Sequence, residues 1–474
     1  KAHVIHTLCL DTGQGALVIT ADEGEASRLR EDLANLGTDA LLYPARDFAL
    51  QGLEGVSKEY EHRRIGVLTA LLSQPGRVVV CPADAAVQWT IPKETLRQRT
   101  IVLREGEQES PALLIERLLA SGYIRCELVE GAGQFAARGG ILDVFPIGWD
   151  KGARIEFWGD EIDSMAAFDP VDQRRIDRIQ ELRIPPAGEV LFDSMEDCAE
   201  LLSAFAEGLS KKQEAAKENI LADAARLRDG VRLSSYDKYI ALAYEKPASI
   251  FDYCGGLLLV CDHRNIRDRQ KSFYTQQNED IKALLEQGKL AKGVDCFSLQ
   301  PGEFAWKLER GHPVFLETFV TGGFDTPLQT LCSFTLRQRN AFMGSLEQLR
   351  EDLAPVLENG TVCAVLAGGE RAASALAADL SDMGIPALYA PNPRELRPGQ
   401  VTVTTGALSA SVEYPAAGLL LLAQSRNTGK TKKYKRPKNA AFIGSIDELK
   451  RGDYVVPGSS FVNQKLKVGD IVYR

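Results

Sequence analysis

The sequence predicts an α/β protein that contains both a parallel and an antiparallel β-sheet. From residue 16 to about 90, short apolar runs alternate with amphipathic helical stretches, as in a parallel sheet whose two faces are covered by helices. From about 100 to 186 the pattern changes to short strands of alternating polarity, separated by turns rich in Gly, Asp and Pro. That pattern is typical of an antiparallel meander, so we expect it to form a separate domain.

The elements of the parallel-sheet region follow from its periodicity. We expect a helix within 1–10, a strand at 16–21, a helix at 25–37, a strand at 40–45, a helix at 61–74 and a strand at 77–81. In the helix 25–37, one buried face is predicted by apolar residues that recur at helical spacing, namely Ala26, Leu29, Leu33 and Leu36. A long helical pattern at 195–230 then precedes a strand at 256–262 and another helix, and a third α/β unit begins at about 326.

The bulk composition excludes several classes of protein. The 474 residues are 45% hydrophobic and 26% charged, which is ordinary for a globular chain, and the net charge of −9 argues against a surface that attracts nucleic acid everywhere. The nine cysteines form no CxxC pair and the five histidines no metal-ligand spacing, so we expect reduced thiols in a cytoplasmic protein without bound metal. We find no signal peptide and no apolar run that could span a membrane. The chain opens on Lys1 within a helical stretch, so we expect residues to precede it in the natural protein.

The stretch "LLLVCDHRN" (257–265) resembles the acidic strand end that binds Mg²⁺ in ATPases. An active ATPase would need a second carboxylate directly after Asp262 to orient water, but this position is His263. The "GKT" at 429–431 lacks the glycine that a phosphate loop requires five residues earlier, where Gln424 stands. We therefore interpret Asp262 and His263 as a degenerate nucleotide site, and predict no catalytic residue and no cofactor in this chain.

The strand "ARIEFWG" carries an unusual outward row. Its alternation predicts that Ile155 and Phe157 face the core, while Arg154, Glu156 and Trp158 face outward. Trp and Arg are the residue types most enriched at binding hot spots, and Arg138 would join them if the neighbouring strand pairs with this one. In the alternative interpretation Trp158 packs under a loop and Arg154 pairs with Glu156 or Asp160, and the pattern alone leaves both open.

Five stretches, in order along nearly the whole chain, resemble the bacterial transcription-repair coupling factors (the Mfd family) and, more weakly, the excision-repair protein UvrB. They are "YPARDFALQGLEGVSKEYEHRRIGVLTALL", "GQFAARGGILDVFPIGWDKGARIEFWGDEIDSMAAFDPVDQRR", "IFDYCGGLLLVCD", "SFTLRQRNAFMGSLEQLREDL" and "PGQVTVTTGALSASVEYPAAGLLLLAQ". The resemblance implies that Arg138, Arg154 and Trp158 match the family's UvrA-contacting residues, although the family often has Phe at the last position.

The resemblance also implies a domain organisation. A degenerate RecA-like, UvrB-like α/β module is expected at 1–99 and 187–325, with a UvrA-binding β domain inserted at 100–186. A further α/β domain is expected at 326–428, followed by a basic linker at 429–443, which has six basic residues and no acid between 429 and 438. Part of an RNA-polymerase-interacting β-barrel domain is expected at 444–474. The tail after Val456 departs from the family pattern, through truncation or missing residues, so polymerase contact is in doubt for this chain.

The implied function is that of an adaptor in transcription-coupled nucleotide excision repair. It would recruit UvrA to RNA polymerase stalled at DNA lesions, while a motor outside this sequence, using ATP and Mg²⁺, would bind double-stranded DNA and displace the polymerase. One alternative is a DNA-dependent ATPase or helicase-like enzyme of UvrB type in its own right. Another is a structural spacer that does not bind UvrA.

Overall fold

The computed structural model describes residues 1–48, 57–319, 322–324, 326–339, 345–393 and 395–424, and the backbone of 442–443, 456–457 and 472–473. The chain divides into two compact units, Lys1–Cys332 and Ser333–Arg474. Parallel and antiparallel sheets both occur, which confirms the predicted α/β class. The finer division into six segments stays a prediction.

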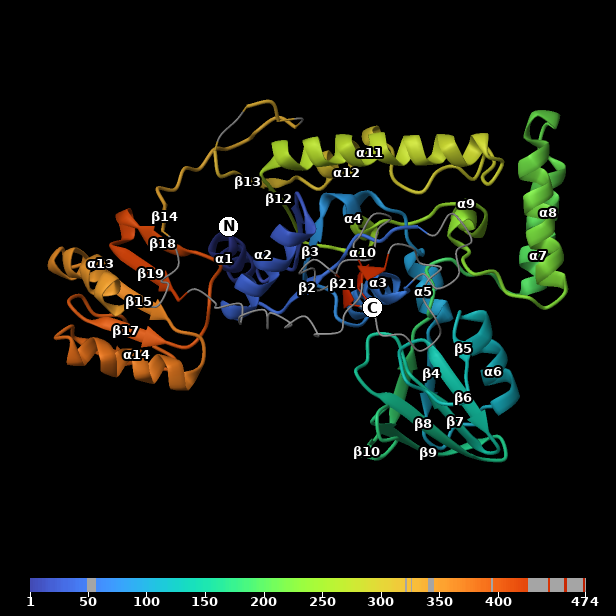
Figure 1. Ribbon diagram of the computed structural model, residues 1–474, viewed down its shortest axis with the longest axis horizontal. Helices are drawn as coiled ribbons and strands as arrows, with labels where there is room; N and C mark the ends of the chain where they lie inside the picture. Colours follow the sequence, from blue (N-terminus) through green and yellow to red (C-terminus); the bar gives the residue numbers. More distant parts are fainter. Residues whose placement is uncertain are drawn as a thin grey trace. The chain divides into compact units, whose positions relative to one another are not determined.

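The first unit is built on a five-stranded parallel sheet with the strand order β13-β12-β1-β3-β2 (Figure 1). Its strands are β1 (Ala16–Thr20), β2 (Ala40–Leu42), β3 (Val78–Pro82), β12 (Leu257–Cys261) and β13 (Val314–Leu316). The surrounding helices are α1 (Ala2–Thr12), α2 (Glu23–Asn35), α3 (Glu59–Ser73), α4 (Ala83–Val87), α10 (Ile250–Tyr253), α11 (His263–Glu286) and α12 (Pro301–Arg310).

Both faces of this sheet are buried, as its continuous apolar strands predict. Val18 and Val80 pack with Leu29 of α2 in one cluster, together with α1. Their strand neighbours Ile19 and Val79 pack in a second cluster that includes α3, α10, α11 and α12. Alternate residues therefore pack against opposite helical layers, which is why nearly every residue of β1 and β3 is apolar.

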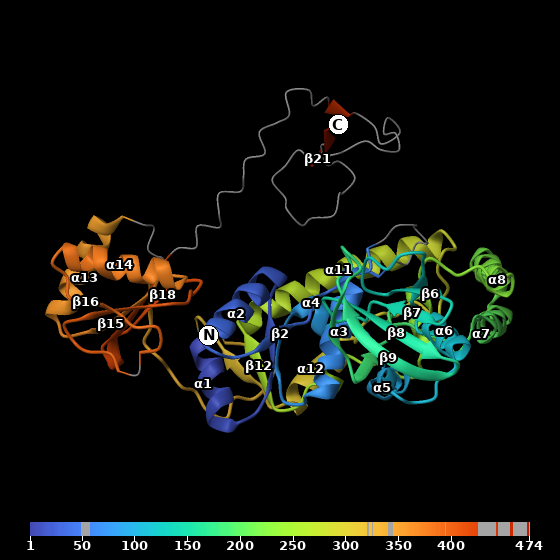
Figure 2. The same cartoon turned by 90° about the horizontal axis from the view of Figure 1, so that it is seen from below.

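A six-stranded, mainly antiparallel sheet of order β10-β9-β8-β7-β6-β5 follows within the same unit, and only β5 and β6 in it are parallel (Figure 2). Its strands are β5 (Ile124–Arg125), β6 (Gln134–Arg138), β7 (Ile141–Val144), β8 (Gly152–Trp158), β9 (Glu161–Phe168) and β10 (Arg175–Arg178). The strands β4 (Ile101–Arg104) and β11 (Glu181–Ile184) pair antiparallel beside it, with α5 (Lys93–Arg99) and α6 (Pro111–Ala120) in the same region.

The long helical pattern at 195–230 forms two helices that lie side by side (Figure 2). They are α7 (Met195–Glu207) and α8 (Glu214–Arg228), separated by the turn η1 (Lys211–Gln213). The short helices η2 (Asp237–Tyr239) and α9 (Ile240–Ala243) lead back toward the parallel sheet.

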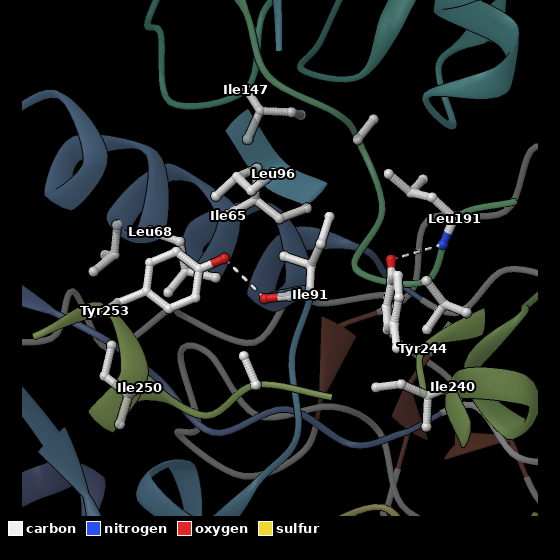
Figure 3. Packing of buried hydrophobic residues seen from close by; sticks show 14 of the residues in the cluster. Ile65, Leu68, Ile91, Leu96, Ile147, Leu191, Ile240, Tyr244, Ile250 and Tyr253 are labelled. Carbon is white, nitrogen blue, oxygen red and sulfur yellow. Dashed lines mark hydrogen bonds between the residues drawn. The ribbon is translucent and has the colours of Figure 1, made fainter. Parts of the chain in front are cut away.

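One hydrophobic core joins the two sheets of the first unit (Figure 3). It contains Ile65 of α3 and Leu96 of α5 as well as Ile147, which follows β7. Two buried tyrosines tie loops into it: Tyr253 Oη donates to the Ile91 carbonyl at 2.8 Å, and Tyr244 Oη accepts the Leu191 N–H at 3.1 Å. The antiparallel sheet is therefore packed firmly on the parallel-sheet module.

The second unit holds a six-stranded sheet of order β14-β18-β19-β15-β17-β16, in which β19, β15, β17 and β16 are parallel. Its elements are β14 (Arg337–Arg339), α13 (Leu346–Glu358), β15 (Val362–Leu366), α14 (Glu370–Asp382), β16 (Ala387–Tyr389), β17 (Val401–Thr404), β18 (Ser411–Tyr414), η3 (Pro415–Ala417) and β19 (Leu419–Ala423). Beyond it, β20 (Phe442–Ile443), β22 (Val472–Tyr473) and β21 (Val456–Pro457) pair antiparallel. The rest of the predicted linker and tail lies outside the described residues.

Across the described ranges, no helix combines the length and apolarity needed to cross a membrane.

Candidate partner-binding site

The structure places Arg138, Arg154 and Trp158 on one face of the antiparallel sheet. Strand β7 pairs with both β6 and β8, so that Arg138 lies opposite Ile141, and Ile141 opposite Glu156. Since alternate residues of a strand face the same side, Arg154, Glu156 and Trp158 share the face that Arg138 occupies. The strand pairing on which the Arg138 prediction depended is confirmed.

Trp158 is the most exposed tryptophan side chain of this sheet. It ends β8, opposite Glu161 across the hairpin turn, and 82% of its surface is accessible to solvent. At this exposure no described loop covers the indole ring. The alternative in which Trp158 packs under a loop is therefore wrong.

Ile141 adds an apolar side chain that the sequence interpretation missed. It is 40% exposed and stands between Arg138 and Glu156 in the strand register. The two glycines between Arg138 and Ile141 indicate a tight turn in the sequence, and this signal could have predicted that the two residues lie opposite each other. We refer to Arg138, Ile141, Arg154 and Trp158 as the sheet-face patch.

Arg154 pairs with Asp143, and not with Glu156 or Asp160 as the sequence allowed. Its Nε and Nη2 donate to the two carboxylate oxygens of Asp143 at 2.7 and 2.9 Å, and the guanidinium carbon lies 5.1 Å from the centre of the Phe168 ring. Hydrogen bonding to Asp143 raises the pKa of Arg154 despite partial burial. Pairing with Glu156 or Asp160 is thus wrong, since Glu156 contacts Arg175 and accepts the Ser164 hydroxyl at 2.9 Å.

Arg138 is exposed, and within the described part of the chain no hydrogen bond or ion pair is found for its side chain. On the opposite face of β8, Ile155 is fully buried as predicted. Phe157 was expected in the core as well, but it lies only partly buried at the edge of the cluster. It is the last residue but one of β8, near the turn, where fewer neighbours cover it.

The second predicted site lies at the carboxyl end of β12. Asp262 adopts a left-handed backbone with φ 52°, and its carboxylate accepts the Lys1 ammonium and, at 2.8 Å, the Thr318 N–H. Burial opposes ionisation of Asp262, but the donors Lys1 and Thr318 outweigh it and lower its pKa. The acidic group is therefore neutralised by residues of the chain itself.

His263 is packed rather than presented to solvent. Its ring is buried and stacks on Phe324 with 4.1 Å between ring centres. Its Nδ1 lies 3.0 Å from Glu317 Oε1, an oxygen that already accepts the His263 backbone N–H at 2.9 Å. The structure brings Asp262 and His263 together, but it leaves the imidazole badly placed to activate water. Among the described residues, no group of three or more His, Cys, Asp or Glu side chains could hold a metal ion.

The antiparallel sheet lies within a segment that matches a known domain family. Residues 101–189 match the family described as "UvrB interaction domain". This range includes the whole antiparallel sheet and every residue of the sheet-face patch.

Relatives extend the match to the rest of the chain. The "Transcription-repair-coupling factor" of Bacillus subtilis is 28% identical over 468 residues, covering 95% of this chain and 39% of the relative. The chain is a relative of the transcription-repair-coupling factors. Proteins of the same description from Staphylococcus haemolyticus (26% identity, 99% of this chain, 42% of the relative) and Staphylococcus aureus strain MRSA252 (26%, 96% and 40%) agree. The chain thus spans about two fifths of the length of these coupling factors.

Proposed function

We propose that this chain is the UvrA-recruiting adaptor part of a transcription-repair-coupling factor. The observation that carries the proposal is the 82% exposed Trp158, which shares a sheet face with Arg138 and Ile141 within the residues that match the UvrB interaction domain. In this proposal the first unit is a degenerate RecA-like module that presents an inserted UvrA-binding domain.

Each side chain of the sheet-face patch has a distinct role in the proposal. Trp158 supplies a rigid apolar anchor with only two side-chain torsions, and Ile141 extends the apolar area beside it. Arg138 and Arg154 supply guanidinium groups for charge-assisted hydrogen bonds to carboxylates of UvrA. A mixed apolar and cationic patch of this kind binds tightly only if the partner excludes water from its centre.

The remaining roles belong to the whole coupling factor. RNA polymerase binding, contact with double-stranded DNA and ATP-driven displacement of the stalled polymerase are proposed for the parent protein, because the chain is similar to transcription-repair-coupling factors. Contact with the polymerase would involve the segment 444–474, most of which lies outside the described residues.

Titration of purified UvrA into this chain by calorimetry tests the proposal. We expect saturable binding, and its absence would favour a structural spacer. Arg138→Glu should bind UvrA much more weakly, because it reverses a charge of the sheet-face patch. Arg226→Glu is the matched control, because it makes the same charge change at an exposed position of α8, away from the sheet. The control should bind UvrA as the wild type does.

The rival proposal is a DNA-dependent ATPase of UvrB type. It draws on Asp262, which stands at the carboxyl end of a parallel strand next to the Lys1 ammonium. The packing of His263 against Phe324 argues against it, and the neighbouring Glu317 carboxylate is buried and already accepts the His263 N–H, so neither side chain is free to orient water. ATP turnover with and without DNA separates the two, since the adaptor should show none.

A further inference from the structure

We propose that Asp143 and Phe168 are positioning residues, which hold the Arg154 guanidinium in the orientation that the partner meets. The inference rests on the proposed function, since it concerns how the sheet-face patch is prepared for UvrA. It assigns a role to two side chains that lie beneath the contact surface.

Asp143 fixes the plane of the guanidinium. It lies directly opposite Arg154 in the β7–β8 register, and its two oxygens accept Nε and Nη2 in a bidentate pair. Asp143 is only 7% exposed, so the surrounding sheet restricts the motion of its carboxylate. The remaining nitrogen, Nη1, has only a long 3.5 Å contact to the Gln173 carbonyl, which leaves one edge of the fork for a partner carboxylate.

The aromatic ring of Phe168 lies beneath the Arg154 guanidinium. This fully buried ring lies 5.1 Å from the guanidinium carbon of Arg154. The ring occupies this place because Gly152, its partner across β8 and β9, has no side chain. A Cβ at Gly152 would come within 2.2 Å of Phe168 Cζ, so any larger residue there would displace the ring.

These contacts reduce the freedom that Arg154 would lose on binding. A free arginine side chain must be ordered when it forms an interfacial hydrogen bond, whereas a preorganised one has already been ordered by folding. We therefore expect that removing the bidentate pair weakens UvrA binding about tenfold, even where Arg154 itself is retained.

A double-mutant cycle with UvrA affinity as the readout tests the inference. Asp143→Asn should weaken binding about tenfold, but should add nothing in an Arg154→Ala background, because Asp143 acts through Arg154. Glu181→Gln is the matched control, since Glu181 also pairs across strands with an arginine, Arg104, in the β4–β11 pair. Equal losses from Asp143→Asn in both backgrounds, or none in the wild-type background, would overturn the proposal. If Asp143→Asn does not fold, Phe168→Leu in the same cycle tests the other positioning residue, because it removes the ring that contacts the Arg154 guanidinium.

A second readout does not depend on UvrA. Hydrogen exchange of the Arg154 Nε–H, followed by NMR in the free chain, should be slow in the wild type and fast in Asp143→Asn. Fast exchange in the wild type would overturn the positioning role while leaving UvrA binding intact. Absence of UvrA binding by a wild-type chain with slow exchange would instead contradict the proposed function.

Discussion

Arg64 and Glu189 form an ion pair of 2.6 Å between side chains that are both fully buried, although they stand 125 residues apart in the chain. Glu189 also accepts Arg46 Nε at 3.0 Å, and Arg46 forms two further hydrogen bonds through Nη1 to Asp237. The network links helix α3 to the segment that leaves the antiparallel sheet. It therefore helps to fix that sheet on the parallel-sheet module.

Removing Glu189 should strongly destabilise the first unit. Glu189→Ala leaves two buried guanidinium groups short of a partner, and breaking a buried ion pair in this way typically costs about 3–5 kcal/mol. Urea denaturation should show the loss. Glu59→Ala, which breaks an exposed pair with Arg63, is the control and should cost less than about 0.5 kcal/mol. Similar effects of the two variants would contradict the structural role given to Glu189.

Stability should fall as the pH is lowered from about 6.5 to 4, in part because of His62. Burial lowers the pKa of His62 to about 4, from an ordinary value of 6.5, and Nε2 lies buried near Gly133 without a hydrogen-bond partner among the described residues. In this pH range the unfolded chain therefore binds a proton that the folded chain does not. The resulting loss in the free energy of unfolding is about 3 kcal/mol at pH 4. His62→Gln should flatten the pH profile of the free energy of unfolding. An unchanged slope in that variant would show that other groups cause the loss.

Mg·ATP at millimolar concentration should leave the melting temperature unchanged. A ligand stabilises a protein only by binding its folded state, and the Asp262 carboxylate is already engaged by Lys1 and Thr318. Thermal melts with and without nucleotide provide the measurement. A reproducible rise of several degrees would contradict the interpretation of this site as degenerate.

Arg154→Glu should reduce stability as well as UvrA affinity. The sequence indicated only that Arg154 faces outward, but in the Arg154→Glu variant Asp143 would face a second carboxylate while only 7% exposed. Like charges opposite each other on neighbouring strands are destabilising. We expect a lower melting temperature for Arg154→Glu and an unchanged one for Arg138→Glu. Equal melting temperatures would show that the Asp143 pair contributes little to the fold.

The sequence predicted those features that depend on local periodicity. The apolar runs of β1 and β3 indicated a doubly covered parallel sheet, and the alternation in β8 placed Arg154 and Trp158 on one face. The partner of Arg154 could not be predicted in the same way, because it depends on the register between β7 and β8. The stacking of Phe324 on His263 could not be predicted either, since no local pattern relates two residues so far apart in the sequence.

The most direct test of the central claim is calorimetric titration of UvrA into Trp158→Ala, beside a thermal melt of the same variant. Trp158 is 82% exposed, so its removal should leave the melting temperature unchanged. As an anchor of the interface, its truncation should cost at least about 2 kcal/mol of binding free energy, or about thirtyfold in affinity. Trp149→Ala is a matched control, because Trp149 follows β7 at the opposite end of β8. A thirtyfold or greater loss of UvrA affinity with an intact fold supports the adaptor function, and wild-type affinity in Trp158→Ala would contradict it.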